Sequence, residues 1–265
     1  MRDVLRPSGL ALLAAVLGIT SFVAFADAHG VVGQRFFPAT LTIDDPFVAD
    51  ELSLPTVQVV RRKKGADSPP TWDTEIDAEL SKRLSRRFGI SLAGSLAIED
   101  PKGGPTIAGF DNMHVAAKYV FIQDAARELL VSGGLEADVG GTGQARVEAE
   151  SFSTLVPQIF FGKGLGDVPA SMRFLKPLAV TGAIGIAIPT KEHTVTRTVA
   201  DDAVDVEREL NPRVLEWGFS LQYNLQYLQS FVEDIGLEAP LNRMIPVVRV
   251  VASVQASYGS DGTSS

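Results

Sequence analysis

The stretch Thr71–Ile98, TWDTEIDAELSKRLSRRFGISLAGSLAI, decides the fold of this chain. On either side of Arg86 and Arg87, its even-numbered positions are mostly apolar and its odd-numbered positions are charged, polar or small. The first half carries acidic residues at four alternate positions: Asp73, Glu75, Asp77 and Glu79. A helix would spread these carboxylates around its axis, whereas a strand gathers them on one face. The stretch therefore predicts a hairpin of two long strands with one apolar face and one polar face.

The same two-residue period recurs along most of the remaining chain. Further strands are predicted at Leu52–Val60, Phe110–Phe121, Leu129–Val139, Ser153–Phe161, Leu178–Ile188, Leu215–Tyr227 and Met244–Val254. Together with the hairpin they make about nine strands of about 10 to 15 residues, against about 5 or 6 in soluble sheets.

The predicted connections alternate in length along the chain. Those at 61–70, 99–109, 140–151 and 189–212 are mostly long and polar, and the last is expected to be a loop from Pro189 to Pro212. Those at 86–87 and 123–127 are short, and those at 162–173 and 228–241 are intermediate. One helical turn is expected at Ala170–Phe174.

Residues 1–28 have the pattern of a secretory signal peptide. Arg2 and Arg6 precede an apolar run from Leu10 to Phe25, and Ala26-Asp27-Ala28 is a small-x-small cleavage site. An uncleaved membrane anchor is the alternative, because the apolar run is somewhat long. Nothing later in the chain offers the roughly 18 uninterrupted apolar residues of a transmembrane helix.

Composition excludes several classes of function. The chain has no cysteine, so it has neither disulfides nor thiolate metal sites. Its net charge is −8, and its one basic cluster, Arg61–Lys64, is short. A nucleic-acid partner is therefore not expected, because phosphate contacts need clustered cations.

A signal peptide followed by long amphipathic strands, with connections alternately short and long, is typical of an outer-membrane barrel. The predicted fold is all-β: a transmembrane antiparallel up-and-down β-barrel, in which the apolar stripes face lipid and the polar stripes face a wet lumen. The predicted organisation is a signal peptide at 1–28, an N-terminal periplasmic segment or plug at 29–52 and the barrel at 53–265. A soluble lipocalin-like barrel has the same period with the faces reversed. Ala, Gly and Ser on the polar face and aromatic residues near the strand ends favour the membrane.

Each face supplies a set of candidate functional residues. The predicted lumen-lining residues are Asp73, Glu75, Asp77, Glu79, Arg83, Asn112, His114, Lys118, Glu136, Asp138, Glu216 and Gln222. The predicted lipid-facing girdle comprises Trp72, Phe88, Tyr119, Phe121, Trp217, Tyr223 and Tyr227. The acidic ladder at 73–79 either attracts cations or pairs with basic residues of neighbouring strands. We expect Arg83 and Lys118 to be such partners, because like charges along one strand face repel.

Several segments resemble one family of proteobacterial outer-membrane barrels, the proteins linked to the MetA pathway of phenol degradation. They are FFPATLTIDDPFVADELSLPT from Phe36, the acidic strand, the RRFG turn and LKPLAVTGAIGIAIPT, and the resemblance extends from Phe36 to about Val251. It implies a passive channel or uptake barrel, with aromatic or hydrophobic compounds as solutes. The chain departs from the barrel pattern at its end, where a Gly/Ser tail replaces a last strand with a terminal aromatic. Bacterial barrels have an even number of strands, so the complete protein is expected to have about twelve.

Two enzyme interpretations are weaker. His29, as a mature N-terminal residue, could chelate copper with a second histidine, and only His114 and His193 remain. Asn112 and His114 share a face and could form part of a Ser-His-Asn hydrolase site, but no motif supplies the serine. Gly140-Gly141-x-Gly143 opens no amphipathic helix and is not a dinucleotide fingerprint.

The sequence therefore predicts a passive channel or transporter in the outer membrane, with no catalytic residues, metal or cofactor. Its expected partners are outer-membrane lipid, the outer-membrane assembly machinery and a small-molecule solute. The alternatives are a non-conducting structural or binding barrel and a soluble periplasmic ligand-binding β-barrel.

Overall fold

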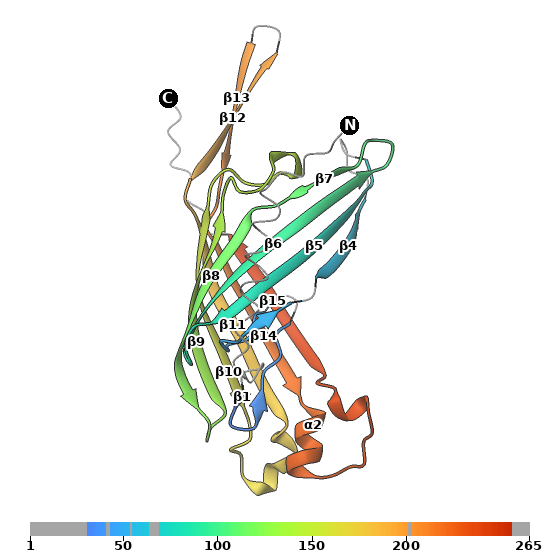
Figure 1. The fold of residues 1–265 in the computed structure, drawn as a ribbon, viewed down its shortest axis with the longest axis vertical. Coiled ribbons are helices and arrows are strands. Elements are labelled where there is room, and N and C mark those ends of the chain that lie inside the picture. The colour runs from blue at the N-terminus through green and yellow to red at the C-terminus, as the bar shows by residue number, and fades with distance from the viewer. Residues whose placement is uncertain (1–30, 41–42, 54, 64–68, 201–202, 256–265) are drawn as a thin grey trace, which may run out of the picture.

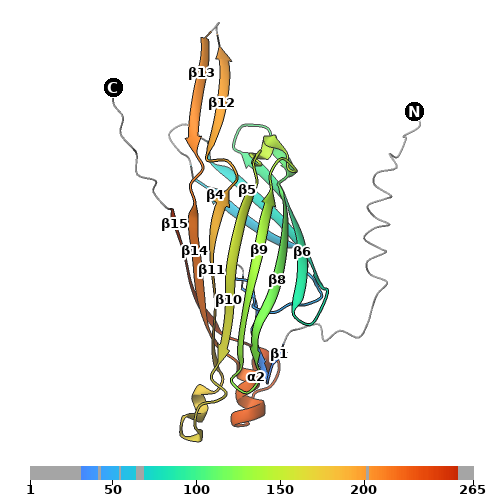
Figure 2. The same ribbon diagram turned by 90° about the vertical axis from the view of Figure 1, so that its left-hand side faces the viewer.

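The computed structural model describes residues 31–40, 43–53, 55–63, 69–200 and 203–255. The predicted signal peptide, 1–28, and His29 lie outside these residues. The described chain is mostly antiparallel β-sheet curled into a half-barrel (Figures 1 and 2). Within the described residues, no helix has the length and apolar character needed to cross a membrane.

The main sheet is built from long strands, each of which pairs with the next one along it. They are β5 (Thr71–Arg83), β6 (Phe88–Pro101), β8 (Met113–Asp124), β9 (Leu129–Val139), β10 (Thr154–Gly164), β11 (Leu178–Pro189), β14 (Val214–Tyr223) and β15 (Val247–Gln255). Three shorter strands, β3 (Glu51–Leu52), β4 (Thr56–Arg62) and β7 (Ile107–Phe110), pair with β5 or β6. The sheet order ends at β15 on one side and at β3 and β4 on the other, so among the described residues the sheet is open.

The hairpin expected at Thr71–Ile98 forms as β5 and β6, which pair from Thr71 opposite Pro101 to Arg83 opposite Gly89. The connections at 84–87, 125–128, 165–177 and 224–246 leave one end of the sheet, which we call the lower end. The connections at 63–70, 140–153 and 190–213 leave the upper end. Short lower connections are thus present at 84–87 and 125–128, but the alternation predicted from sequence does not extend along the whole sheet, because the lower connection at 224–246 is longer than the upper ones at 63–70 and 140–153.

Three predicted segments differ from the structure. The expected loop Pro189–Pro212 contains a second hairpin, β12 (His193–Ala200) with β13 (Ala203–Leu210), which projects beyond the upper end (Figure 1). The strand expected at Leu52–Val60 is split into β3 and β4 around Pro55, since proline cannot donate to a ladder. The strand expected to end at Tyr227 stops at Tyr223.

The chain beyond Tyr223 turns into a helix because the Asn224 side chain accepts a hydrogen bond from Tyr227 N at 2.9 Å. The helical pieces are α2 (Leu225–Tyr227), the π-helical η3 (Leu228–Val232) and the 3-10 turns η1 (Ala145–Val147), η2 (Ala170–Leu175) and η4 (Leu241–Arg243). The helical turn expected at Ala170–Phe174 is η2.

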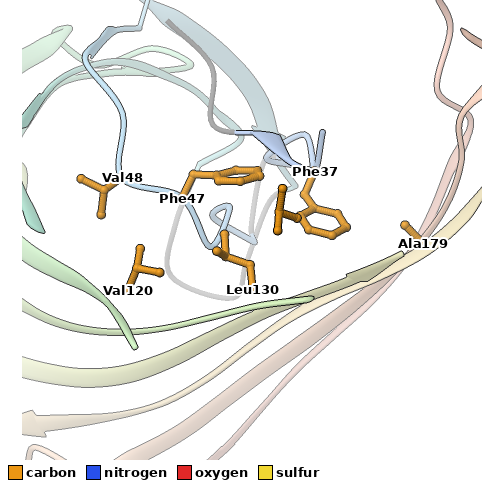
Figure 3. Packing of buried hydrophobic residues seen from close by; sticks show 7 residues of the cluster. Phe37, Phe47, Val48, Val120, Leu130 and Ala179 are labelled. Carbon is orange, nitrogen blue, oxygen red and sulfur yellow. The ribbon is translucent and has the colours of Figure 1, made fainter. Parts of the chain in front are cut away.

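The two faces of the sheet differ in what covers them. The apolar core lies inside the curve, where Phe37, Phe47 and Val48 from the N-terminal segment pack on Val120 and Leu130 of the sheet (Figure 3). This segment, residues 31–40 and 43–50, includes β1 (Val31–Val32) and β2 (Arg35–Phe36), which pair only with each other. Large apolar side chains are exposed on the sheet, among them Leu92, Phe121, Leu135, Ile159, Ile184, Phe219 and Leu221.

Candidate functional site

A hollow of about 930 Å³ lies between the inner face of the sheet and the N-terminal segment. One wall consists of residues 39–40, 43–45 and 47–49, and the other consists mostly of small and polar residues from β5 to β14, with Phe160 among its few large apolar residues. Side chains alternate between the two faces of a strand, so polar residues two positions apart, such as Asp77 and Glu79 of β5, reach the hollow together.

Half of the predicted lumen-lining residues border this hollow: Asp77, Glu79, His114, Lys118, Glu136 and Glu216. They come from strands β5, β8, β9 and β14 and sit at positions of the same parity within each strand. The sequence pattern therefore brings them together, although they are far apart along the chain.

A polar group on β8, β9 and β10 lies at the centre of the inner wall. His114 Nδ1 lies 3.6 Å from Glu136 Oε1, and Gln158 Nε2 donates to Glu136 Oε2 at 2.9 Å. The group presents the carboxylate of Glu136, the imidazole of His114 and the amide of Gln158 to the hollow. Together these side chains can bind a polar substituent of a solute.

The N-terminal segment contributes its own charges to the hollow. Lys118 Nζ forms an ion pair with Asp44 and donates to the carbonyl oxygen of Asp45 at 2.8 Å. The pKa of Asp45 is raised to about 7, chiefly because burial disfavours the charged form and also because Asp44 is adjacent; Lys118 opposes the rise.

The acidic ladder finds partners other than those expected. Arg62 of β4 donates to Asp73 through Nη2 at 2.8 Å, and the hydroxyl of Ser95 donates to Glu75 at 3.1 Å. The hydroxyl of Ser81 donates to Glu79 at 2.9 Å.

The two expected cations pair with the N-terminal segment. Lys118 binds Asp44, and Arg83 lies beside Asp50, which also accepts from Lys82 at 2.8 Å. The expectation that Arg83 and Lys118 pair with the ladder is therefore wrong. Chain segment 43–50 supplies closer carboxylates than β5 does.

The remaining predicted lumen residues have structural contacts. Asn112 is buried and fastens the upper connection, donating to the Glu150 carbonyl oxygen and accepting from Gly143 N, both at 2.9 Å. Gln222 is buried and donates to Thr181 at 3.1 Å and to Ser220 at 3.0 Å. Asp138 lies opposite His114 and Thr154, and its Oδ1 atom is buried without a hydrogen-bond partner.

Six of the seven predicted girdle residues lie on strands of the sheet. Trp72, Tyr119 and Phe121 are exposed, and Phe88, Trp217 and Tyr223 are partly buried. The rings form clusters, with Tyr119 5.3 Å from Phe121 and Trp217 5.5 Å from Phe219.

Tyr227 is not a girdle residue. It lies in α2 rather than on a strand, it is 5% exposed, and its hydroxyl donates to Glu128 Oε1 at 3.0 Å. Sequence reasoning also missed Arg35, which is 1% exposed and binds Glu128 as well. Neither contact could be found from periodicity, because Arg35 lies in a segment that has none.

The described residues do not form the arrangements that the enzyme interpretations require. His114 makes no hydrogen bond to a serine among the described residues, and Asn112 bonds to the backbone instead. In the same part of the chain, no three His, Cys, Asp or Glu side chains are grouped to hold a metal ion.

Comparison of the sequence with protein-family models and with curated proteins finds no match.

Proposed function

We propose that this chain forms an outer-membrane β-barrel that passes small solutes passively through the polar hollow. The observation that supports it most is the sidedness of the half-barrel. Apolar side chains cover its outer surface, and the charged stripes of at least four strands face a hollow inside the curve. A soluble barrel of the lipocalin type would have these faces reversed.

The strand lengths fit a membrane. β5 has 13 residues, so at about 3.3 Å per residue it is roughly 43 Å long. Tilted by about 45°, it spans about 30 Å, the thickness of the hydrocarbon core. The proposal requires the free edges at β15 and at β3 and β4 to be paired in the membrane, because unpaired backbone groups in lipid cost several kcal/mol each.

The resemblance to the phenol-degradation barrels supports the same function and suggests aromatic or hydrophobic compounds as solutes. The inner wall carries both kinds of surface that such a solute needs. His114, Glu136 and Gln158 can bind a polar substituent, and Phe160 and Ala117 border the same hollow.

A second candidate is a non-conducting structural or binding barrel. It is favoured by the N-terminal segment, which fills part of the interior. The third alternative, a soluble periplasmic ligand-binding barrel, predicts that the protein is extracted without detergent.

Two measurements test the proposal. Fractionation should place the protein in the outer membrane and release it only with detergent; release by buffer alone would overturn the membrane assignment. The purified full-length protein and a variant lacking residues 31–50 should then be compared in planar bilayers. Ion currents, larger in the deletion variant, are expected. A deletion variant that is folded but carries no current would refute a pore and favour the second candidate.

A further inference from the structure

The N-terminal segment is fitted to the inner wall of the sheet. A Cβ atom added to Gly162 of β10 would lie 2.6 Å from the ring of Phe37, and one added to Gly89 of β6 would lie 2.5 Å from Val48. Both contacts are closer than any side chain allows, so the wall has glycines where the segment needs room.

The segment is nevertheless not part of the sheet. Among the described residues, no hydrogen bond between two backbone atoms joins 31–40 or 43–50 to the main sheet. Side chains alone hold it: Ser132 donates to the Pro46 carbonyl oxygen, and Lys118 binds Asp44. The first backbone pairing with the sheet comes after it, where Glu51 lies opposite Ser81. The segment can therefore leave without breaking the ladder of any long strand.

A buried ionic cluster holds the far end of the segment. Arg35 Nε donates to Glu128 Oε2 at 3.1 Å, and its guanidinium lies 4.0 Å from the centre of the Tyr227 ring. Arg35 also donates to the carbonyl oxygens of Pro177, at 2.9 Å, and Lys176. One side chain thus ties the segment to three separate lower connections.

We propose that the N-terminal segment, residues 31–40 and 43–50, is a removable plug, held in its seat in part by the cluster Arg35–Glu128–Tyr227, and that breaking this cluster raises the fraction of molecules in which the plug has left the hollow. The physical reason is that an arginine buried beside a neutral partner loses its ion pair but keeps its desolvation cost. Leaving the seat returns Arg35 to water. The effect of unseating on conduction rests on the proposed function, whereas the seating itself does not.

The absence of cysteine from the chain allows a direct measurement of seating. Val32 is 0% exposed, so the single thiol of a Val32→Cys variant reacts with a maleimide only when the plug leaves. In detergent, Glu128→Gln should raise the labelling rate by roughly a hundredfold. The matched control is Glu233→Gln, which breaks the exposed 2.8 Å pair with Arg173 at the same end of the sheet and should leave the rate unchanged.

A second variant tests whether faster labelling results from loss of the cluster rather than from misfolding of the wall. Arg35→Leu alters only the plug and leaves the wall intact, and it should also accelerate labelling. Folding is checked by the shift in electrophoretic mobility on heating. Folded Glu128→Gln and Arg35→Leu proteins that label as slowly as the parent would overturn the proposal, and so would equal acceleration by Glu233→Gln.

A reversible disulfide between the plug and the wall tests whether seating controls conduction. Val48 Cγ1 lies 2.5 Å from the ideal Cβ position of Gly89, so the two Cβ atoms of a Val48→Cys, Gly89→Cys pair would be at most about 4 Å apart, within disulfide range. Glu128→Gln should increase channel opening, the oxidised tether should cancel the increase and a reductant should restore it. Faster labelling without any current, including in the 31–50 deletion, would refute the channel while leaving the plug supported.

Discussion

The fit between Gly162 and Phe37 gives the sharpest quantitative prediction, because one methyl group tests it. In a Gly162→Ala protein the new Cβ would lie 2.6, 2.7 and 3.0 Å from three atoms of the Phe37 ring. The ring cannot move aside freely, since it is fully buried and stacks on Phe47 at 5.8 Å. Overpacking of this kind costs about 1 to 3 kcal/mol. The cost falls on the seated state alone, because an unseated plug takes the ring away from residue 162.

The expected result is a labelling rate at Val32→Cys that rises roughly 5- to 150-fold in Gly162→Ala, as about 1.4 kcal/mol corresponds to a factor of ten. The control is Gly94→Ala in β6, where an added Cβ meets nothing within 4 Å, and its rate should not change. Combining Gly162→Ala with Phe37→Leu should cost less than the sum of the single changes, because the smaller side chain relieves the overlap. Equal rates for Gly162→Ala and Gly94→Ala, or strict additivity in the double variant, would refute this account of the seat.

Three further predictions concern the pKa of Asp45, the Asn112 contact and the girdle. Burial in the seated plug raises the pKa of Asp45 to about 7, so ionisation of Asp45 opposes seating. The plug should therefore be held most firmly near pH 4 and should loosen as the pH rises to about 7. Above pH 7 its seating should change little. Labelling of Val32→Cys, divided by that of the exposed Lys102→Cys at each pH, measures this slope, and Asp45→Asn should abolish it. Asn112→Ala removes both hydrogen bonds to the connection at 140–153, so trypsin should cleave after the exposed Arg146 several-fold faster. The control, Thr106→Ala in the adjacent connection, should not change the rate of this cleavage. Trp72 and Trp217 are the only tryptophans, and lipids with brominated acyl chains should quench their fluorescence; unchanged emission would argue against a lipid-facing girdle.

Periodicity predicted the parts of this fold that depend on neighbouring residues along a strand. The hairpin of β5 and β6 was predictable because its polar and apolar positions alternate over its whole length. The same rule put His114, Lys118 and Glu136 on one face, and all three border the hollow. Alternation misled at Leu225 and Tyr227, where the pattern continues but Asn224 has already started a helix.

The contacts that hold the plug could not be predicted in this way. Arg35 and Glu128 are 93 residues apart, and their pairing depends on how far the sheet curls, which no local pattern encodes. The hairpin of β12 and β13 was missed for a different reason. Charged residues and flanking prolines gave it the composition of a loop, and it lies outside the main sheet, whose inner and outer faces impose the strong alternation seen elsewhere.

The small residues of the inner wall make room for the plug at some positions and border the hollow at others. Ala179 and Gly162 lie beneath the plug, whereas Ala183 borders the hollow. If the plug leaves, Val120 and Leu130 of the wall lose their cover, and the buried Val32, Phe37, Phe47 and Val48 of the plug lose theirs. Burying such a side chain is worth about 1.5 to 3 kcal/mol, so the two rings alone favour the seated state by about 3 to 6 kcal/mol. The unseated fraction would then be roughly 10⁻² to 10⁻⁴ before the Arg35 cluster is counted. The proposed channel would therefore rest closed, and its opening would require a ligand or condition that replaces the contacts of Arg35 or of the two rings.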